Sequence, residues 1–281
     1  MRFLPLLGLL LLAACSNNTK ALLQRADPTA SARPADYNAQ ALLQRDYADL
    51  SPVELSQAFL SAQKRDRDVS AIVERYRNFD PQTLAAALPT DAARKAFWIN
   101  TYNGFIQYVL QQQPDLYDDR GEFFKAKQLA IAGQSLSFDD IEHGIIRHGR
   151  AKLSAGYLPD LLDSDFEELM ATSEVDPRIH FAVNCGAKDC PPVHLLDEAS
   201  LDAQLDALTK SYLTKTTDYD EAANTITISP LMNWFRGDFG GKNSTHAFLR
   251  AYDIIPQNAK PKITYGPYDW TLALGTYGPA V

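Results

Sequence analysis

The order of apolar and polar residues along the chain predicts a mostly helical protein. From Ala39 to Leu88 the apolar positions recur at helical spacing, and Ser51-Pro52-Val53-Glu54 combines an N-cap, a first-turn proline and a capping-box acid. The range 91–113 carries the strongest helical pattern of the chain. Further helices are expected over 138–147, 201–213, 230–235 and 246–252.

Two segments are predicted to be strands. Residues 178–183 alternate, with Ile179, Phe181 and Val183 on one face, which is typical of a central strand. Residues 225–229 form the second segment, and 263–274 is an aromatic, turn-rich tail. Because helices outnumber strands and the strands are far apart in sequence, we expect an α+β fold. It is a helix-rich single domain around a small β-sheet, with a helical N-terminal extension.

The N-terminal residues predict an export signal and a lipid anchor. Arg2 precedes a Leu-rich run over 3–12 that is too short to span a bilayer, which needs about 20 apolar residues. Leu12-Ala13-Ala14-Cys15 resembles the bacterial lipobox, which implies cleavage before Cys15 and lipidation of that residue. Ser16 resembles the pattern of lipoproteins sent to the outer membrane.

We therefore expect a bacterial envelope lipoprotein, anchored in the outer membrane and facing the periplasm, whose membrane contact is the lipid on Cys15. Its predicted parts are a signal peptide (1–14), the lipidated cysteine with a flexible, polar tether (15–37), a helical extension (38–90) and the main domain (91–275).

The charge balance argues against a nucleic-acid partner. The 281 residues carry 27 Lys+Arg against 35 Asp+Glu, a formal net charge of -8, which has the wrong sign for counterion-release binding. At 46% hydrophobic residues, the chain can bury a core without disulfide staples. The expected ligand is an unknown small molecule or peptide.

Two polar features on the predicted helices have both a structural and a functional interpretation. Asn103 lies on an apolar helical stripe, so its amide either ties down a neighbouring loop or lines a polar site. Asp139, His143 and Arg147 follow one another at four-residue spacing. They form either a solvated charge ladder or a histidine that is oriented by an acid.

The segment 176–192 concentrates titratable and thiol groups. Cys185 could be a thiolate nucleophile if His180, His143 or Lys188 lowered its pKa, with the amide of Gly186 as an oxyanion donor. The competing interpretation is a disulfide between Cys185 and Cys190, since an exported protein sits in an oxidising compartment.

A metal site and a nucleotide site are both weakly indicated. Cys185, Cys190 and His194 have a plausible local spacing but lack the second pair of ligands typical of zinc. The segment Gly237–Asn243 approaches a P-loop but lacks one spacer residue and the Ser/Thr after its lysine. We therefore expect no metal and no cofactor.

Four ordered motifs resemble the DUF547 family. They are Ala96-Phe-Trp-Ile-Asn-Thr-Tyr-Asn103, Leu136-Ser-Phe-Asp-Asp-Ile-Glu-His-Gly-Ile-Ile-Arg147, Arg178-Ile-His-Phe-Ala-Val-Asn-Cys-Gly-Ala187 with Cys190-Pro-Pro192, and Tyr268-Asp-Trp270. The resemblance covers about 91–274 and implies a domain, not a reaction, because the family is largely uncharacterised.

The sequence is compatible with two functions. The first is a thiol-dependent acyl-transfer hydrolase with Cys185 as nucleophile, His143 or His180 as general base, and Asn103 or Asp139 as orienting group. The second is a non-catalytic ligand- or protein-binding module with a structural Cys185–Cys190 disulfide. We expect one site, formed by these residues together with a binding set of Asn184, Gly186, Arg178 and Asp139.

Overall fold

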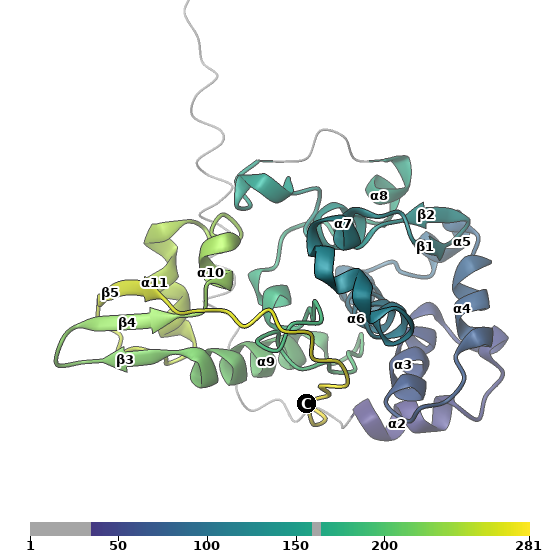
Figure 1. The fold of residues 1–281 in the computed structure, drawn as a ribbon, viewed down its shortest axis with the longest axis horizontal. Helices are drawn as coiled ribbons and strands as arrows, with labels where there is room; N and C mark the ends of the chain where they lie inside the picture. Colours follow the sequence, from purple (N-terminus) through teal and green to yellow (C-terminus); the bar gives the residue numbers. More distant parts are fainter. Residues whose placement is uncertain (1–34, 159–163) are drawn as a thin grey trace, which may run out of the picture.

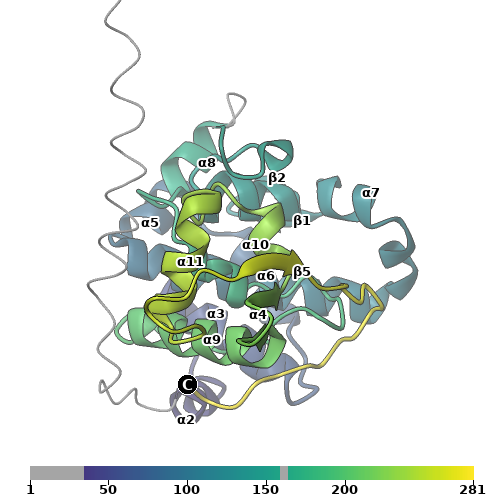
Figure 2. The ribbon, with the colours of Figure 1, turned by 90° about the vertical axis from the view of Figure 1, so that its left-hand side faces the viewer.

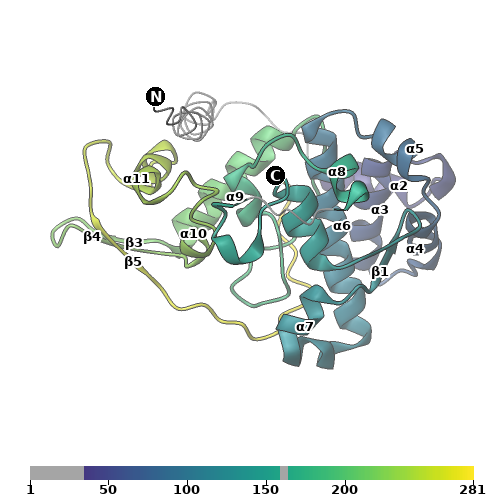
Figure 3. The same ribbon diagram turned by 90° about the horizontal axis from the view of Figure 1, so that it is seen from above.

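The computed structural model describes residues 35–158 and 164–281. The expected signal peptide, Cys15 and most of the tether lie outside the described residues. The described part has a large helical region at one end and a small sheet with two helices at the other, as two views show (Figures 1 and 3).

Helices form most of the regular structure. The α-helices are α2 (Ala35–Leu42), α3 (Pro52–Gln63), α4 (Ser70–Arg77), α5 (Pro81–Ala86), α6 (Asp91–Gln112), α7 (Arg120–Lys125), α8 (Asp165–Met170), α9 (Leu201–Thr216), α10 (Leu231–Trp234) and α11 (Lys242–Ala251). Short 3₁₀ helices are η1 (Tyr47–Asp49), η2 (Pro114–Asp119), η4 (Lys152–Ser154) and η5 (Pro177–Phe181), and η3 (Asp140–Ile146) is a π-helix.

The strands form two small sheets. The strands β1 (Leu129–Ile131) and β2 (Gln134–Leu136) make an antiparallel hairpin. In the second sheet, β4 (Thr225–Ile228) lies between β3 (Asp218–Asp220), which is antiparallel to it, and β5 (Lys262–Tyr265), which is parallel. The predicted helix-rich α+β class and the strand predicted near 225–229 are confirmed.

The larger core is organised by α6, which packs against α3 in the helical region (Figure 1). Gly104 allows a close approach, because a Cβ at this position would lie 2.5 Å from Cδ1 of Phe59. Asn100 is fully buried and donates from Nδ2 to Oγ of Ser56 and to the carbonyl of Leu196. Through Asn100, α6 thereby also binds the segment that leads into α9.

A smaller core lies around β4, α10 and α11. It includes Phe181, Phe239 and Phe248, whose ring centroids are 5.1–6.2 Å apart. The two cores meet just before the cysteine segment, because Phe181 belongs to the smaller core and Ala182 to the larger one.

The prediction of a strand over 178–183 is wrong, because Pro177–Phe181 is the 3₁₀ helix η5. Asp176 caps this helix by accepting from the backbone N–H of Arg178, and Pro177 occupies its first turn. The alternation of apolar residues has another cause. Ile179 packs into the larger core and Phe181 into the smaller one, so the segment bridges two cores instead of lining one face of a sheet.

The helix predicted over 138–147 is present, but most of it is the π-helix η3. Its wider turn is visible in the hydrogen bond from the N–H of Arg147 to the carbonyl of Glu142, five residues earlier. Such segments occur often at functional sites. In this protein the π-helix places Glu142 and His143 at the same cavity.

The C-terminal segment, residues 266–281, runs from β5 back across the molecule towards α2 (Figures 1 and 2). The N–H of Gly275 donates to Oε1 of Gln107 on α6, and the N–H of Lys188 donates to the carbonyl of Thr271. These bonds hold the segment beside the cysteine loop, so residues near 268–270 reach the same region as residues near 140 and 180.

Candidate functional site

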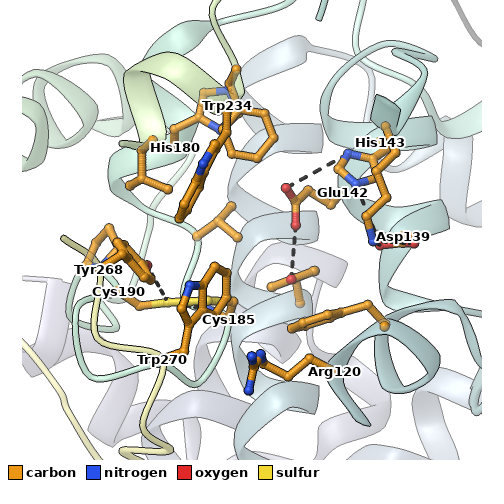
Figure 4. A pocket seen from close by; sticks show the side chains of 18 residues that line it. Arg120, Asp139, Glu142, His143, His180, Cys185, Cys190, Trp234, Tyr268 and Trp270 are labelled. Carbon is orange, nitrogen blue, oxygen red and sulfur yellow. Dashed lines mark hydrogen bonds and ion pairs between the residues drawn. A yellow bond between two sulfur atoms is a disulfide. The ribbon is translucent and has the colours of Figure 1, made fainter. Parts of the chain in front are cut away.

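A pocket of about 380 Å³ lies where α6, α7, η3, the cysteine loop, α10 and the C-terminal segment meet (Figure 4). Trp234, Tyr268 and Trp270 lie on one side of it, and His143 and Asp139 lie on the other. Volumes of this size are typical of small-molecule sites.

Glu142 lies at the centre of the polar side of the pocket. Tyr102 on α6 donates from its hydroxyl to Oε2 of Glu142 over 3.0 Å. Burial raises the pKa of Glu142, and the nearby carboxylate of Asp139 also raises it, while Arg147 opposes the change. The pocket therefore favours the neutral form of this carboxyl more than water does.

His143 is held neutral and in one tautomer. Nη1 of Arg147 lies 2.7 Å from Nδ1 of His143, and because a guanidinium can only donate, Nδ1 accepts. The ring proton is therefore on Nε2, which lies 3.6 Å from Oδ1 of Asp139. Burial lowers the pKa of His143 well below its usual value, and the charge of Arg147 adds to this effect.

Asp238 joins Arg147 to His180. Its carboxylate accepts from Nε and Nη2 of Arg147 over 2.7 and 3.1 Å, and from Nε2 of His180 over 2.8 Å. The side chains of Arg147 and Asp238 are fully buried. Burial by itself would raise the pKa of Asp238, but the bonds and charges of His180 and Arg147 outweigh it and lower the pKa to about 2.

The same contacts define the state of His180. Because the carboxylate of Asp238 only accepts, Nε2 of His180 carries the proton and Nδ1 can accept one. Burial lowers the pKa of His180, and the attraction to Asp238 opposes but does not cancel this effect. The ring of Phe235 stacks on His180 with centroids 3.9 Å apart and lies 4.7 Å from the guanidinium carbon of Arg147.

The glycine-rich segment around Asp238 serves close packing. The N–H of Gly237 donates to the carbonyl of Ala155, and a Cβ on Gly237 would lie 2.6 Å from the carbonyl oxygen of Gly156. At Gly156, with φ of +86°, a Cβ would lie 2.0 Å from Oδ1 of Asp238. The resemblance of this segment to a P-loop therefore has a packing explanation.

The two cysteines form a disulfide, with Cα atoms 6.3 Å apart, on the wall of the pocket. The sulfur of Cys190 accepts from the backbone N–H of Cys185 over 3.1 Å and from the hydroxyl of Tyr268 over 3.2 Å. In this state the chain has no Cys185 thiolate, and the cysteines are not thiolate ligands for a metal. His194, the third residue of the weakly indicated metal site, uses Nδ1 with the carbonyl of Pro279.

The aromatic side of the pocket is a cluster of three rings. Trp234 stacks on Trp270 with centroids 5.4 Å apart, and Tyr268 lies against both at 5.1 and 4.8 Å. The guanidinium carbon of Arg120 on α7 lies 5.2 Å from the centroid of a Trp270 ring. Trp234 keeps 36% of its surface exposed and so can contact a ligand.

Residues 86–213 match the model of the family described as "Protein of unknown function, DUF547". The chain contains a DUF547 domain. No curated protein and no solved structure matches the chain.

The DUF547 domain begins at the end of α5 and ends inside α9. It includes Glu142, His143, His180 and the disulfide, whereas Asp238 and the aromatic cluster follow it in the chain. The DUF547 domain therefore supplies one part of the pocket, and the residues that follow it in the chain supply the other part.

The site residues that the sequence predicted within the DUF547 domain fall into two groups. His143, His180, Asp139 and Cys185 line one pocket. The others, Asn103, Asn184, Gly186 and Arg178, hold the chain in place around it.

Asn103 supports the cysteine loop from α6. Its Nδ2 donates to the carbonyl of Ala182, and its Oδ1 accepts from the N–H of Asn184. Asn184 in turn donates from Nδ2 to the carbonyl of Pro191 and accepts from the N–H of Gly186 over 3.0 Å. The amide of Gly186, the expected oxyanion donor, is therefore engaged inside the loop.

Arg178 belongs to a separate ionic network. Its guanidinium bonds Asp176, Asp202 and Asp206 at 2.7–3.0 Å. Burial by itself would raise the pKa of Asp176, but Arg178 outweighs it and lowers the pKa to about 2. Asp139 lies at the pocket and pairs with Lys152 at 2.7 Å.

Sequence reasoning missed Glu142, Asp238, Trp234 and Arg120 as parts of the site. Glu142 stands next to His143 in a motif that was already singled out, so adjacency was its only signal. Asp238 lies in the rejected P-loop segment, 58 residues after its partner His180. Among the described residues, no group of His, Cys, Asp and Glu is placed to hold a metal, and no helix has the length and apolar character needed to cross a membrane.

We expect Asp238→Asn to lower the free energy of unfolding by about 3–5 kcal/mol at pH 7, because it leaves the buried guanidinium of Arg147 without a counter-charge. The pKa of Asp238 is about 2 in the fold and about 3.9 unfolded, so its stabilising effect is complete above about pH 5 and is lost progressively as the pH falls from there through about 2. Urea unfolding from pH 7 to pH 3 should therefore show the variant and the native protein converging progressively below about pH 5.

The matched control is Asp118→Asn, a change at an exposed aspartate on η2, which should alter the free energy of unfolding by less than about 0.5 kcal/mol. A difference between Asp238→Asn and the native protein that is small at pH 7, or that grows at low pH, would contradict the assignment.

Proposed function

We propose that the pocket binds a small, neutral ligand that carries a ring and hydrogen-bonding groups. The observation that carries this proposal is the pairing of a buried polar wall with an aromatic wall across one cavity of about 380 Å³. An aromatic face binds the ring, and the few fixed polar groups set its orientation.

The neutrality of the ligand follows from the charges of the polar wall. His143 is neutral, and burial raises the pKa of Glu142. The carboxylate of Asp139 is paired with Lys152 at 2.7 Å. A charged ligand would lose its hydration without gaining an unpaired counter-charge on this wall, and the guanidinium of Arg120 at the aromatic wall already lies over a Trp270 ring. Hydroxyl or amide groups, by contrast, can bond with Nε2–H of His143 and the carboxyl of Glu142.

The proposal can be tested with methyl β-glucopyranoside and uridine, two neutral ring compounds, by saturation-transfer NMR. We expect at least one to bind, and we expect Trp234→Ala to weaken its binding by about fivefold or more, because the aromatic wall loses an exposed ring. Benzoate and benzylamine, as charged ring compounds, should bind more weakly.

The control variant is Tyr157→Ala, which removes an aromatic ring that is 52% exposed and does not line this pocket. It should leave the affinity unchanged. Binding of neither neutral compound, or binding that Trp234→Ala does not change, would refute the proposal.

A second candidate is the thiol-dependent acyl-transfer hydrolase. The observation that favours it is that Cys185 lines the same pocket as His180, whose Nδ1 can accept a proton. This activity requires that the Cys185–Cys190 disulfide is first reduced, because a sulfur in a disulfide is not a nucleophile.

If this candidate is right, the reduced protein should release one equivalent of nitrophenol per chain from p-nitrophenyl acetate in a rapid burst. Cys185→Ser should abolish the burst, and Cys190→Ser, which removes the other sulfur, should retain it. A burst that survives Cys185→Ser would exclude Cys185 as the nucleophile.

We also propose that the protein is anchored in the bacterial envelope by acyl chains on Cys15. The support is the lipobox-like sequence before this residue. In a bacterial host fed labelled palmitate, the native chain should carry label in the membrane fraction and Cys15→Ala should not. Cys190→Ala should keep the label, and label on the Cys15→Ala chain would overturn the assignment.

A further inference from the structure

The two sulfurs of the disulfide have different surroundings. Cys190 is 6% exposed, and its sulfur accepts two hydrogen bonds, from the N–H of Cys185 and from the hydroxyl of Tyr268. Both cysteines line the pocket, but Cys185 is only partly buried. Over 35–158 and 164–281, no comparable donor contacts the sulfur of Cys185.

This asymmetry has a direct consequence for thiol–disulfide exchange. In that reaction the sulfur that leaves becomes a thiolate, and a sulfur that is already bonded by donors leaves more readily. The two donors at Cys190 favour negative charge on its sulfur. The attacked sulfur must be reachable from solvent, and of the two, Cys185 is the more exposed.

We propose that the Cys185–Cys190 disulfide is an exchange site for a small-molecule thiol, in which Cys185 is attacked and Cys190 leaves. The thiol is a small molecule because the attacked sulfur is reached through a pocket of about 380 Å³. This activity goes beyond ligand binding by the same pocket and needs neither of the functions proposed above.

The thiol R–SH gives up its proton, and its thiolate attacks Sγ of Cys185, so that a bond between R–S and Cys185 forms while the bond between Cys185 and Cys190 breaks. Cys190 leaves as a thiolate and takes up a proton. A second R–SH attacks the sulfur of R in the mixed disulfide, which releases R–S–S–R and the Cys185 thiol. Two thiol molecules are oxidised and one protein disulfide is reduced.

The pocket contains a group that can take the first proton. Nε2 of His180 donates to Asp238, so Nδ1 has a free electron pair, and the ring lines the same pocket as Cys185. His143 is unsuited to this role, because Arg147 donates to its Nδ1 and its Nε2 already carries the proton.

The order of attack can be read from the products. The full chain in its oxidised state is treated briefly with N-acetylcysteine in the absence of denaturant, quenched with acid, alkylated with iodoacetamide and mapped by peptide mass spectrometry. We expect N-acetylcysteine on Cys185 and the alkyl group on Cys190. Adducts on Cys190, an equal division between the two, or no reaction until the protein unfolds would each overturn the proposal.

The role of the donor at Cys190 has its own test. Tyr268→Phe removes the hydroxyl that contacts this sulfur and should slow reduction by N-acetylcysteine about threefold to tenfold. Tyr265→Phe, at an exposed tyrosine on β5, is the matched control and should leave the rate unchanged. An unchanged rate for folded Tyr268→Phe would refute leaving-group stabilisation by this hydroxyl.

These results are independent of the ligand proposed above. The mapping of the native chain needs no variant to fold, and neither readout requires binding of a neutral ring compound. Failure of the sugar and nucleoside to bind would therefore leave the exchange site intact, and failure of the exchange would leave the binding proposal intact.

Discussion

The buried carboxylate of Asp238 is the constraint on which the arrangement of the site depends. Asp238 precedes Phe239 of the smaller core, while its partner Arg147 follows Ile145 and Ile146 of the larger one. A guanidinium and a carboxylate without water must be matched in position, because an unpaired buried charge costs several kcal/mol. The ion pair thus fixes how the two cores meet, and the pocket lies at that junction.

The protonation states on the polar wall follow from this pair. Arg147 uses its Nε and Nη2 for Asp238 and its Nη1 for His143, which makes His143 a fixed donor at Nε2. Asp238 sets the proton of His180 on Nε2 in the same way. One ion pair therefore fixes the protonation of two imidazoles: His143 can donate from Nε2, and His180 can accept at Nδ1.

The cysteine loop is held by a different principle. Its backbone carries polar groups into a buried region, where each needs a partner. Asn103 and Asn184 supply these partners by bonding the backbone of residues 182–191, and the C-terminal segment adds a bond from Lys188 to Thr271. The loop thus presents the disulfide on the pocket wall, with the hydroxyl of Tyr268 on the sulfur of Cys190.

Local patterns along the chain determined the helices, because periodic burial and capping depend on neighbours in sequence. The range 91–113 was predicted within one residue of α6, and Ser51 caps α3 as its motif indicated. The alternation at 178–183 led to a wrong strand prediction, because apolar residues at every second position occur both on one face of a strand and in a 3₁₀ segment that lies between two cores. The sequence also singled out His143, His180, Asp139 and Cys185, since chemistry-bearing residues were concentrated in short motifs.

Only the tertiary structure decided what those residues do. It showed that Asn103 supports a loop, that Arg178 serves an ionic network, and that Asp238, Glu142 and the aromatic cluster complete the pocket. The physical reason is the separation along the sequence of the residues that interact. Helix formation is settled within a few residues, whereas pairing of Asp238 with His180 spans 58 positions and depends on where both cores place the chain.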